Sequence, residues 1–517
     1  MLPDRSTLVS LVVTSLALLA ACATPATAAV PDTRPWPPPE LAQFYGQEIV
    51  FEPCAPYATT PTDEELFADE RFDCARVQVP LDYADPAGTR GEVALLRVKA
   101  SGDRIGSLLV NPGGPGASGM NYAALLGSFW DSGSLQGRFD VIGFDPRGVG
   151  ASNPGLDCYS DAEYDSGEAP SGTLPGVTDE QATVEVAQRC MDGSGGATAL
   201  TSVGTSEVVQ DMDVLRAVLG DEKLSYFGAS YGSELGAMYA EKFPQNVRAI
   251  AIDGAAHPEL GAAERLIASY TGYQEAFTGL ATACAAGPDC PLGSDPGRAM
   301  ESFHALVRPL QDRPVPTADG RGLTYEDAVT GVLVGLRIEA QWPTIVTGLD
   351  ELAAGRGDVL LGLRDSIYGR GPDGRYVYDA DRLLAISCMD RPRRTPAEQT
   401  DLARQLVAAT PLLDTGRPVA ERHDECSAWP EPASRPEPWL TGGVDVPPTL
   451  IVSVTGDPAT PHAGGVAMAR LLGSSLLTVE GNQHGVALLG QSECVDDIVS
   501  DYLINLRTPP ADARCTL

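Results

Sequence analysis

The sequence has little positive charge. It contains 36 lysines and arginines against 70 aspartates and glutamates in 517 residues, which gives a formal net charge of −34. No basic run interrupts this balance, so binding to a phosphate backbone would be opposed electrostatically, and we expect no nucleic-acid partner. The acidity has two interpretations: a solubilising surface, or attraction of cationic substrates such as peptides with a free amine.

Long hydrophobic runs are equally scarce. Residues 8–21 form one apolar run of signal-peptide length, too short for a membrane span and followed by no second hydrophobic segment, so we expect export. The residues Leu19-Ala20-Ala21-Cys22 resemble a bacterial lipobox, which would attach the mature protein to the outer face of the membrane through a lipid on Cys22. The alternative is ordinary cleavage after Ala26-Thr27-Ala28 and free secretion.

No cysteine spacing is typical of a zinc site, because the one close pair, Cys284 and Cys290, has no histidine nearby, and we expect no metal. Without Cys22, ten of the eleven cysteines remain, and in an oxidising compartment an even number favours disulfides. Proximity in the sequence predicts five local pairs: Cys54–Cys74, Cys158–Cys190, Cys284–Cys290, Cys388–Cys426 and Cys494–Cys515.

The hydrophobic pattern predicts an α/β fold with a mostly parallel sheet and helices on both faces. Two alternating segments are followed by short, continuously apolar runs that end in glycine-rich turns, as in strands buried on both faces. The expected strands are 77–83, 92–98, 106–110, 139–144, 224–227, 247–252, 447–454 and 475–479. The expected helices include 206–219, 262–283, 325–337 and 463–472.

The chain is too long for one compact core, so we expect two lobes. From residue 258 the strand pattern gives way to helical periodicity, which predicts a helical cap inserted into the core. The expected division is a signal peptide with lipobox (1–22), a proline-rich tether (23–45), the first part of the core (46–257), the cap (258–440) and the end of the core (441–517).

Ser230 lies in Gly228-Ala229-Ser230-Tyr231-Gly232, a G-x-S-x-G motif that follows one predicted strand and opens a helix. This is the context of the nucleophile elbow of α/β hydrolases, where small residues allow a strained turn that exposes the serine hydroxyl. The motif predicts Ser230 as a nucleophile. The alternative is a surface serine in a glycine loop.

A serine nucleophile needs a base, and an acid that orients the base; in this fold they follow in the order serine, acid, histidine. Of the five histidines only His484 follows the last long predicted strand. Asp457 directly follows the strand before it, which would bring both residues to one sheet edge. Asp253, after an earlier strand, is the rival acid, and we expect it to be structural. The other histidines are His257, His304, His423 and His462.

A tetrahedral intermediate also needs backbone N–H donors for its oxyanion. The elbow supplies one from Tyr231, and the glycine-rich turn 111–116 after an early strand supplies the second, which we expect to be Gly114. The alternative for this segment is a plain tight turn.

Together, the segments 79–83, 111–116, 144–150 and 228–232, with the Asp457 and His484 segments, resemble the secreted bacterial tripeptidyl aminopeptidases, relatives of proline iminopeptidase. The resemblance spans roughly residues 45–515. It implies a serine exopeptidase that releases short peptides, in this family tripeptides, from free N-termini through an acyl-enzyme. It further implies that the cap limits access, that a peptide with a free N-terminus is the partner, and that no cofactor is needed.

An exopeptidase must hold the substrate's α-ammonium, normally with carboxylates. Asp390 and Glu421, in the cap close to paired cysteines, are candidates for this role. Glu234, one turn after Ser230, stands where relatives often carry an uncharged residue and is a third candidate. His257 is another departure from the family pattern.

Two other functions remain open at this point. A carboxylesterase or lipase would use the same machinery with a more apolar cap pocket, and a non-catalytic surface protein would keep the fold for binding. The sequence makes no prediction of the oligomeric state.

Overall fold

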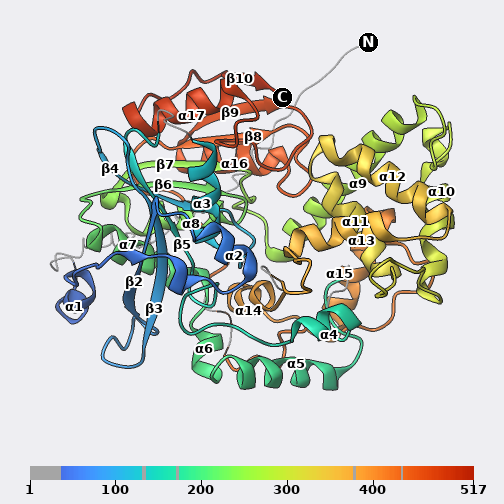
Figure 1. The fold of residues 1–517 in the computed structure, drawn as a ribbon, viewed down its shortest axis with the longest axis horizontal. Coiled ribbons are helices and arrows are strands. Elements are labelled where there is room, and N and C mark those ends of the chain that lie inside the picture. Colours follow the sequence, from blue (N-terminus) through green and yellow to red (C-terminus); the bar gives the residue numbers. More distant parts are fainter. Residues whose placement is uncertain (1–36, 131–134, 170–173, 377–379, 432, 434) are drawn as a thin grey trace, which may run out of the picture. The chain divides into compact units, whose positions relative to one another are not determined.

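A ten-stranded sheet organises the chain, in the order β1-β2-β3-β5-β4-β6-β7-β8-β9-β10 (Figure 1). The computed structural model describes residues 37–130, 135–169, 174–376, 380–431, 433 and 435–517; the expected export segment and Cys22 lie outside these residues. The strands are β1 (Glu52–Pro53), β2 (Phe72–Pro80), β3 (Arg90–Val98), β4 (Gly106–Asn111), β5 (Phe139–Phe144), β6 (Leu224–Ala229), β7 (Val247–Asp253), β8 (Leu450–Val454), β9 (Ser475–Glu480) and β10 (Arg514–Thr516).

The sheet is antiparallel at one end and parallel elsewhere. β1, β2, β3 and β5 pair antiparallel, whereas every pair from β5 through β4 to β10 is parallel. All residues of β4 and β8 are buried, as expected for parallel strands covered on both faces. The α/β fold class is therefore confirmed, and each expected strand is present. The short edge strands β1 and β10 were not predicted, because two or three residues carry too little pattern.

Helices cover both faces of the sheet. α7, α8 and α16 pack on one face, and α3 and α17 on the other, each with its own set of buried apolar side chains. The helices of the core are α1 (Ala42–Tyr45), α2 (Pro61–Leu66), α3 (Gly119–Phe129), α4 (Asp161–Ser166), α5 (Glu180–Gly193), α6 (Ala197–Thr201), α7 (Thr205–Val218), α8 (Gly232–Lys242), α16 (His462–Leu472) and α17 (Glu493–Asn505).

Between β7 and β8 the described residues form helices and no strand. Figure 1 shows most of these helices, in yellow and orange, gathered beside one another. They share a hydrophobic core of their own, built from side chains such as Phe277, Phe303 and Leu349. α14 is the exception, because its Ile386 and Met389 pack with the core. The helices are α9 (Ala262–Ala285), α10 (Ala299–Val307), α11 (Tyr325–Leu336), α12 (Trp342–Ala353), α13 (Asp358–Tyr368), α14 (Ala380–Asp390) and α15 (Pro396–Ala409).

Residues 40–517 form one compact unit that includes both the core and this insertion. All five predicted disulfides are present: Cys54–Cys74, Cys158–Cys190, Cys284–Cys290, Cys388–Cys426 and Cys494–Cys515. Within the described part of the chain, no helix combines the length and the hydropathy needed to cross a bilayer.

Candidate active site

Ser230 stands on a sharp turn between β6 and α8. Its φ of 55° is in the left-handed region, which a residue other than glycine rarely occupies and which costs about 1 kcal/mol or more. The Ser230 N–H donates to the Asp253 carbonyl over 2.9 Å, which ties the turn to the end of β7. A Cβ at Gly228 would lie 2.4 Å from the Gly232 carbonyl oxygen, and one at Gly232 would lie 2.8 Å from the Asn111 carbonyl oxygen. The elbow therefore requires both glycines, as predicted.

His484 and Asp457 meet at the carboxyl ends of β9 and β8. The Nδ1 atom of His484 lies 3.0 Å from each carboxylate oxygen of Asp457. Asp457 is 3% exposed, and its oxygens also accept bonds from the Ala459 and Thr460 N–H groups and the Thr460 hydroxyl. This arrangement fixes the imidazole and leaves its Nε2 atom for a second partner. Sequence reasoning missed Thr460, although a hydroxyl three residues after the acid was a usable signal.

The glycine-rich turn after β4 packs directly against the elbow. Gly113 and Gly114 have φ values of 101° and 109°, and the Gly113 N–H donates to the Asn111 side chain over 2.9 Å. A Cβ at Gly113 would lie 2.9 Å from both the Ser230 Cβ and the Tyr231 backbone nitrogen. The backbone of this turn therefore approaches the nucleophile as closely as sterics allow.

These residues line one cavity of about 900 Å³. Its wall includes Ser230, His484, Gly114 and Tyr231, so residues more than 350 positions apart in the sequence share one surface. A half-buried serine that lines the cavity from a strained turn, a histidine held by a buried carboxylate and the backbone N–H groups of the elbow and the glycine turn can together carry out acyl transfer. The structure brings Ser230, His484, Gly114 and Tyr231 to one cavity, and their catalytic roles stay a prediction.

The sequence profile described as the alpha/beta hydrolase fold matches residues 106–491. The chain belongs to this family. Serine protease Hip1 of Mycobacterium tuberculosis is 41% identical over 456 residues, which cover 86% of this chain and 87% of that protein. Carboxylesterase B of the same species is 39% identical over 490 residues, 92% of each chain. Tripeptidyl aminopeptidase of Streptomyces lividans is 28% identical over 486 residues, 86% of this chain and 83% of that protein.

The elbow and these relatives together identify the α/β hydrolase described here as a serine hydrolase. The expected resemblance to tripeptidyl aminopeptidases is present, but the relatives named serine protease and carboxylesterase are more similar to this chain.

Glu234 is the one expected ammonium ligand that lines the same cavity as Ser230. Its carboxylate pairs with the buried guanidinium of Arg435, which also lies 3.8 Å from Asp390. Burial opposes the charge of Arg435, but the Glu234 and Asp390 carboxylates outweigh this effect and raise its pKa. Arg435 was missed, because it lies in a loop 201 residues from Glu234.

The other two candidates for the ammonium site lie elsewhere: Asp390 lines a second cavity beside the catalytic one, and Glu421 lines neither. Asp390 is 5% exposed, and its two oxygens accept the N–H and the hydroxyl of Thr205, whose oxygen lies 2.5 Å from the Tyr231 hydroxyl. Burial raises the pKa of Asp390. Asp390 therefore supports the elbow through Thr205 and the Tyr231 hydroxyl. Glu421 is exposed and lines neither this cavity nor the one beside it.

His257 lines the cavity as a second histidine. Its Nδ1 atom accepts the Glu259 N–H over 3.3 Å, and burial lowers its pKa. Both effects favour the neutral ring.

Asp253 joins the elbow to the loop that carries His484. Besides its carbonyl bond to Ser230, its Oδ2 atom accepts the Val486 and Ala487 N–H groups over 2.6 and 2.7 Å. Its Oδ1 atom is buried and has no hydrogen-bond partner among the described residues. Burial raises the pKa of Asp253 to about 6. The carboxylate does not contact His484 and holds the backbone around it, in agreement with the structural role that we expected.

The insertion also reaches the histidine loop. The His484 N–H donates to the Arg337 carbonyl at the end of α11 over 2.7 Å, and the Glu339 N–H donates to the Asn482 carbonyl over 3.1 Å. The Asn482 side-chain amide donates a hydrogen bond of 2.8 Å to the Glu339 carboxylate. The backbone around His484 is thus fixed from two sides, by Asp253 in the core and by the insertion.

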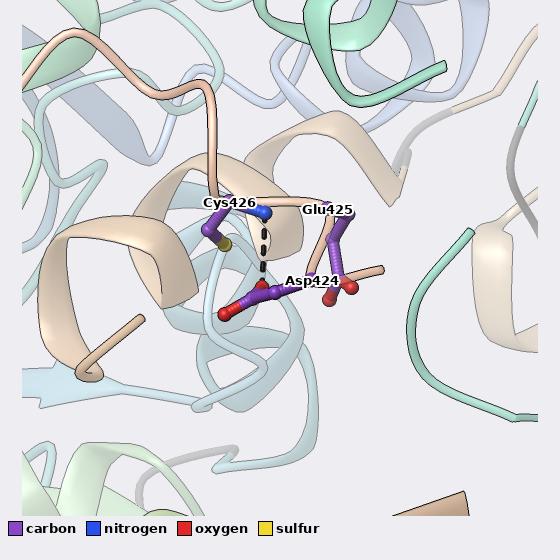
Figure 2. Close-up of side chains that lie close together, drawn as sticks. All are labelled: Asp424, Glu425 and Cys426. Atoms are coloured by element: carbon purple, nitrogen blue, oxygen red, sulfur yellow. Dashed lines mark hydrogen bonds between the residues drawn. The ribbon is translucent and has the colours of Figure 1, made fainter. Parts of the chain in front are cut away.

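Among the residues that the structure describes, one group of possible metal ligands lies in the insertion. Donor atoms of Asp424, Glu425 and Cys426 lie within 4.8 Å of one another (Figure 2). The guanidinium of Arg391 binds both Asp424 and Glu425 over 2.8 Å, and Cys426 is bonded to Cys388. An arginine and a disulfide thus already use these donor atoms, which makes the group an ion-pair network.

Proposed function

We propose that this chain is an exported serine exopeptidase that releases short peptides from free N-termini. Ser230 is the nucleophile, His484 the general base and acid, Asp457 the residue that orients His484, and the Gly114 and Tyr231 N–H groups bind the oxyanion. The observation that carries the proposal is the shared cavity, where the strained serine, the carboxylate-held histidine and Glu234 line one wall.

The reaction follows from this geometry. The Ser230 oxygen attacks the scissile carbonyl carbon while its proton passes to Nε2 of His484, and the resulting oxyanion is stabilised by backbone N–H groups. The His484 proton then moves to the leaving amine, which departs as the acyl-enzyme forms. A water molecule then attacks the acyl carbon while His484 takes its proton. The bond between the acyl carbon and the Ser230 oxygen breaks, the short peptide leaves with a new carboxyl group, and His484 returns the proton to Ser230.

Selection of a free N-terminus is assigned to Glu234. Its carboxylate is fixed by Arg435 and lines the catalytic cavity one helical turn from the nucleophile. A carboxylate held in this way binds an α-ammonium more strongly than a mobile one, because less side-chain entropy is lost. The Streptomyces lividans relative named tripeptidyl aminopeptidase supports the choice of tripeptides. The disulfides support export, because they form in oxidising compartments.

The test is a pair of fluorogenic tripeptide amides that differ only in an acetyl group on the N-terminus. We expect the fluorophore to be released from the free peptide at least about tenfold faster than from the acetylated peptide, because acetylation removes the ammonium interaction. Equal turnover of both would overturn the exopeptidase assignment.

Carboxylesterase activity is the second candidate, favoured by the 39% identical relative of that name. Hydrolysis of p-nitrophenyl esters with no cleavage of either peptide amide would select it. A fluorophosphonate probe separates both from a non-catalytic binding protein: we expect labelling of the wild type and none of Ser230→Ala. Equal labelling of the two would contradict the assignment of the nucleophile.

A further inference from the structure

A second cavity of about 400 Å³ adjoins the catalytic one. The two share wall residues, among them Tyr231, Glu234 and Arg265. Since Tyr231 follows the nucleophile in the elbow, a substrate bound at Ser230 can extend into the smaller cavity.

Arg265 is a cation without an acidic partner in this wall. It is half-buried near the start of α9, donates to the Leu260 carbonyl over 2.8 Å, and stacks 5.8 Å from the centre of the Trp439 ring. Burial lowers its pKa. Among the described residues no carboxylate lies within ion-pairing distance of its guanidinium, whereas Arg391 and Arg435 in the same wall are both paired.

The acidic groups near Arg265 are already engaged. Glu234 pairs with Arg435, and both oxygens of Asp390 accept bonds from Thr205. Glu437 accepts the Ala262 N–H. Each of these carboxylates offsets part of the charge of Arg265 at longer range, and none binds it directly.

Arg394 is a second lining residue of the smaller cavity with the same features. Its guanidinium donates to Gln399 over 3.3 Å and makes no ion pair with the described residues. Burial lowers the pKa of Arg394 as it does that of Arg265. Two half-buried guanidiniums without carboxylate partners therefore face one cavity, in a chain whose net charge is −34.

Helix stability does not explain Arg265. It lies four residues into α9, at the end where the helix dipole favours negative charge, so its charge there is unfavourable. The first N–H groups of this helix are capped by acids, because Glu264 accepts the Gly261 N–H and Glu437 accepts the Ala262 N–H.

We infer that Arg265, assisted by Arg394, makes the smaller cavity a subsite for a carboxylate on the substrate, so that peptides with a glutamate or aspartate near the N-terminus are preferred. This inference rests on the proposed exopeptidase function. Glu234 binds the α-ammonium and Arg265 binds the acidic side chain of the first or second residue. Arginine suits this role because its planar guanidinium binds a carboxylate with two parallel hydrogen bonds.

The experiment uses glutamate and glutamine peptides, which have the same shape and differ in charge. The free tripeptides Glu-Ala-Ala and Ala-Glu-Ala, and the glutamine peptides Gln-Ala-Ala and Ala-Gln-Ala, are measured as inhibitors of p-nitrophenyl acetate hydrolysis by the full chain. The same four sequences are then tested as fluorogenic amides. We expect the glutamate peptide to inhibit about tenfold more strongly than its twin at one of the two positions, as for a charge-assisted hydrogen bond.

In Arg265→Gln the ratio of inhibition by the glutamate peptide to inhibition by the glutamine peptide should fall to near one. In Arg265→Lys it should take an intermediate value, because the ammonium keeps the charge but cannot form the two parallel hydrogen bonds of a guanidinium. Arg404→Gln is the matched control, since Arg404 is exposed on α15 and its loss should leave the ratio unchanged. If Arg265→Gln does not fold, Arg265→Lys and Arg394→Gln still test the subsite.

Equal inhibition by glutamate and glutamine peptides in the wild type, or none by either, would overturn the subsite. A ratio that survives in Arg265→Gln would overturn the role of this residue. Glutamate-selective inhibition without cleavage of any amide would support the subsite and contradict the exopeptidase function, so the two failures are distinguishable.

Discussion

The sheet core and the helical insertion place functional residues in different ways. In the core, Ser230, Asp457 and His484 each follow a buried parallel strand, so the sheet brings them to one edge. In the insertion, the residues that reach the cavity, such as Arg265 and Arg337, lie on helices that pack through their own hydrophobic core. The comparison indicates that the core supplies the residues for the reaction, and that the insertion, together with Glu234 on α8, forms the walls that receive the substrate.

The largest effect should come from the core. In Asp457→Asn the shape is kept, but an amide cannot hold His484 in the required tautomer, so we expect kcat to fall about 10⁴-fold on every substrate. The measurement is kcat of the wild type and of Asp457→Asn on a p-nitrophenyl ester and on an unblocked peptide amide. Asp512→Asn, at an exposed aspartate of the core, should leave both rates unchanged. A loss confined to one substrate class would break the division between chemistry and selection.

Gly113→Ala tests the turn that faces the elbow. The added Cβ would lie 2.6 Å from the Ala229 carbonyl oxygen, at a φ of 101°, so the turn must shift away from the oxyanion. We expect kcat to fall about 10²-fold, the loss typical of one oxyanion donor. Gly362→Ala in α13 is the matched control from the insertion, because a Cβ there has nothing within 4 Å. Full activity of Gly113→Ala would remove Gly114 from the oxyanion site.

Asp253 should link stability to pH. Burial raises its pKa to about 6, above the value of about 3.9 in an unfolded chain, so its stabilising contribution is full below pH 4 and is lost as the pH rises through 6. The free energy of unfolding should therefore fall by about 3 kcal/mol more in the wild type than in Asp253→Asn between pH 4 and 7.

Urea unfolding of both proteins, with disulfides intact and followed by tryptophan fluorescence, measures this difference. Asp253→Asn keeps an oxygen for the Val486 and Ala487 N–H groups, whereas Asp253→Ala loses it and should also lower kcat. If the free energy of unfolding depends on pH in the same way in the wild type and in Asp253→Asn, the Asp253 carboxyl does not titrate in this range.

The smallest expected effect concerns selection. In Glu234→Gln the bond to Arg435 can persist while the charge that binds the α-ammonium is lost, so the preference for free over acetylated peptides should fall about tenfold. The ratio of kcat/KM for the two amides measures it. Glu241→Gln is the control: Glu241 lies farther along α8 and bonds Thr441 outside both cavities. An unchanged ratio in Glu234→Gln would move ammonium recognition to another residue.

Much of the core could be predicted because its signals are local. Continuous apolar strands ending in glycine turns predicted the parallel sheet, and the order of Ser230, Asp457 and His484 along the chain predicted their meeting at one edge. The disulfides were predictable for the same reason, since each pair is close in sequence. The short helices α4 and α6 and the edge strands β1 and β10 were missed, because their short segments carry little periodicity.

The tertiary structure alone decided how the insertion meets the core. Helical periodicity identifies an apolar stripe but not the side chains that another helix will bring to it, so no local pattern pairs Arg435 with Glu234 or bonds Asp390 to Thr205. The same holds for the Arg337 carbonyl that accepts the His484 N–H, and for Arg265, whose lack of an acidic partner is visible only once every nearby carboxylate is placed. Local patterns could predict Ser230, Asp457 and His484, because each residue follows a strand whose place in the sheet sets its position. The packing of distant segments determined the walls of the cavity.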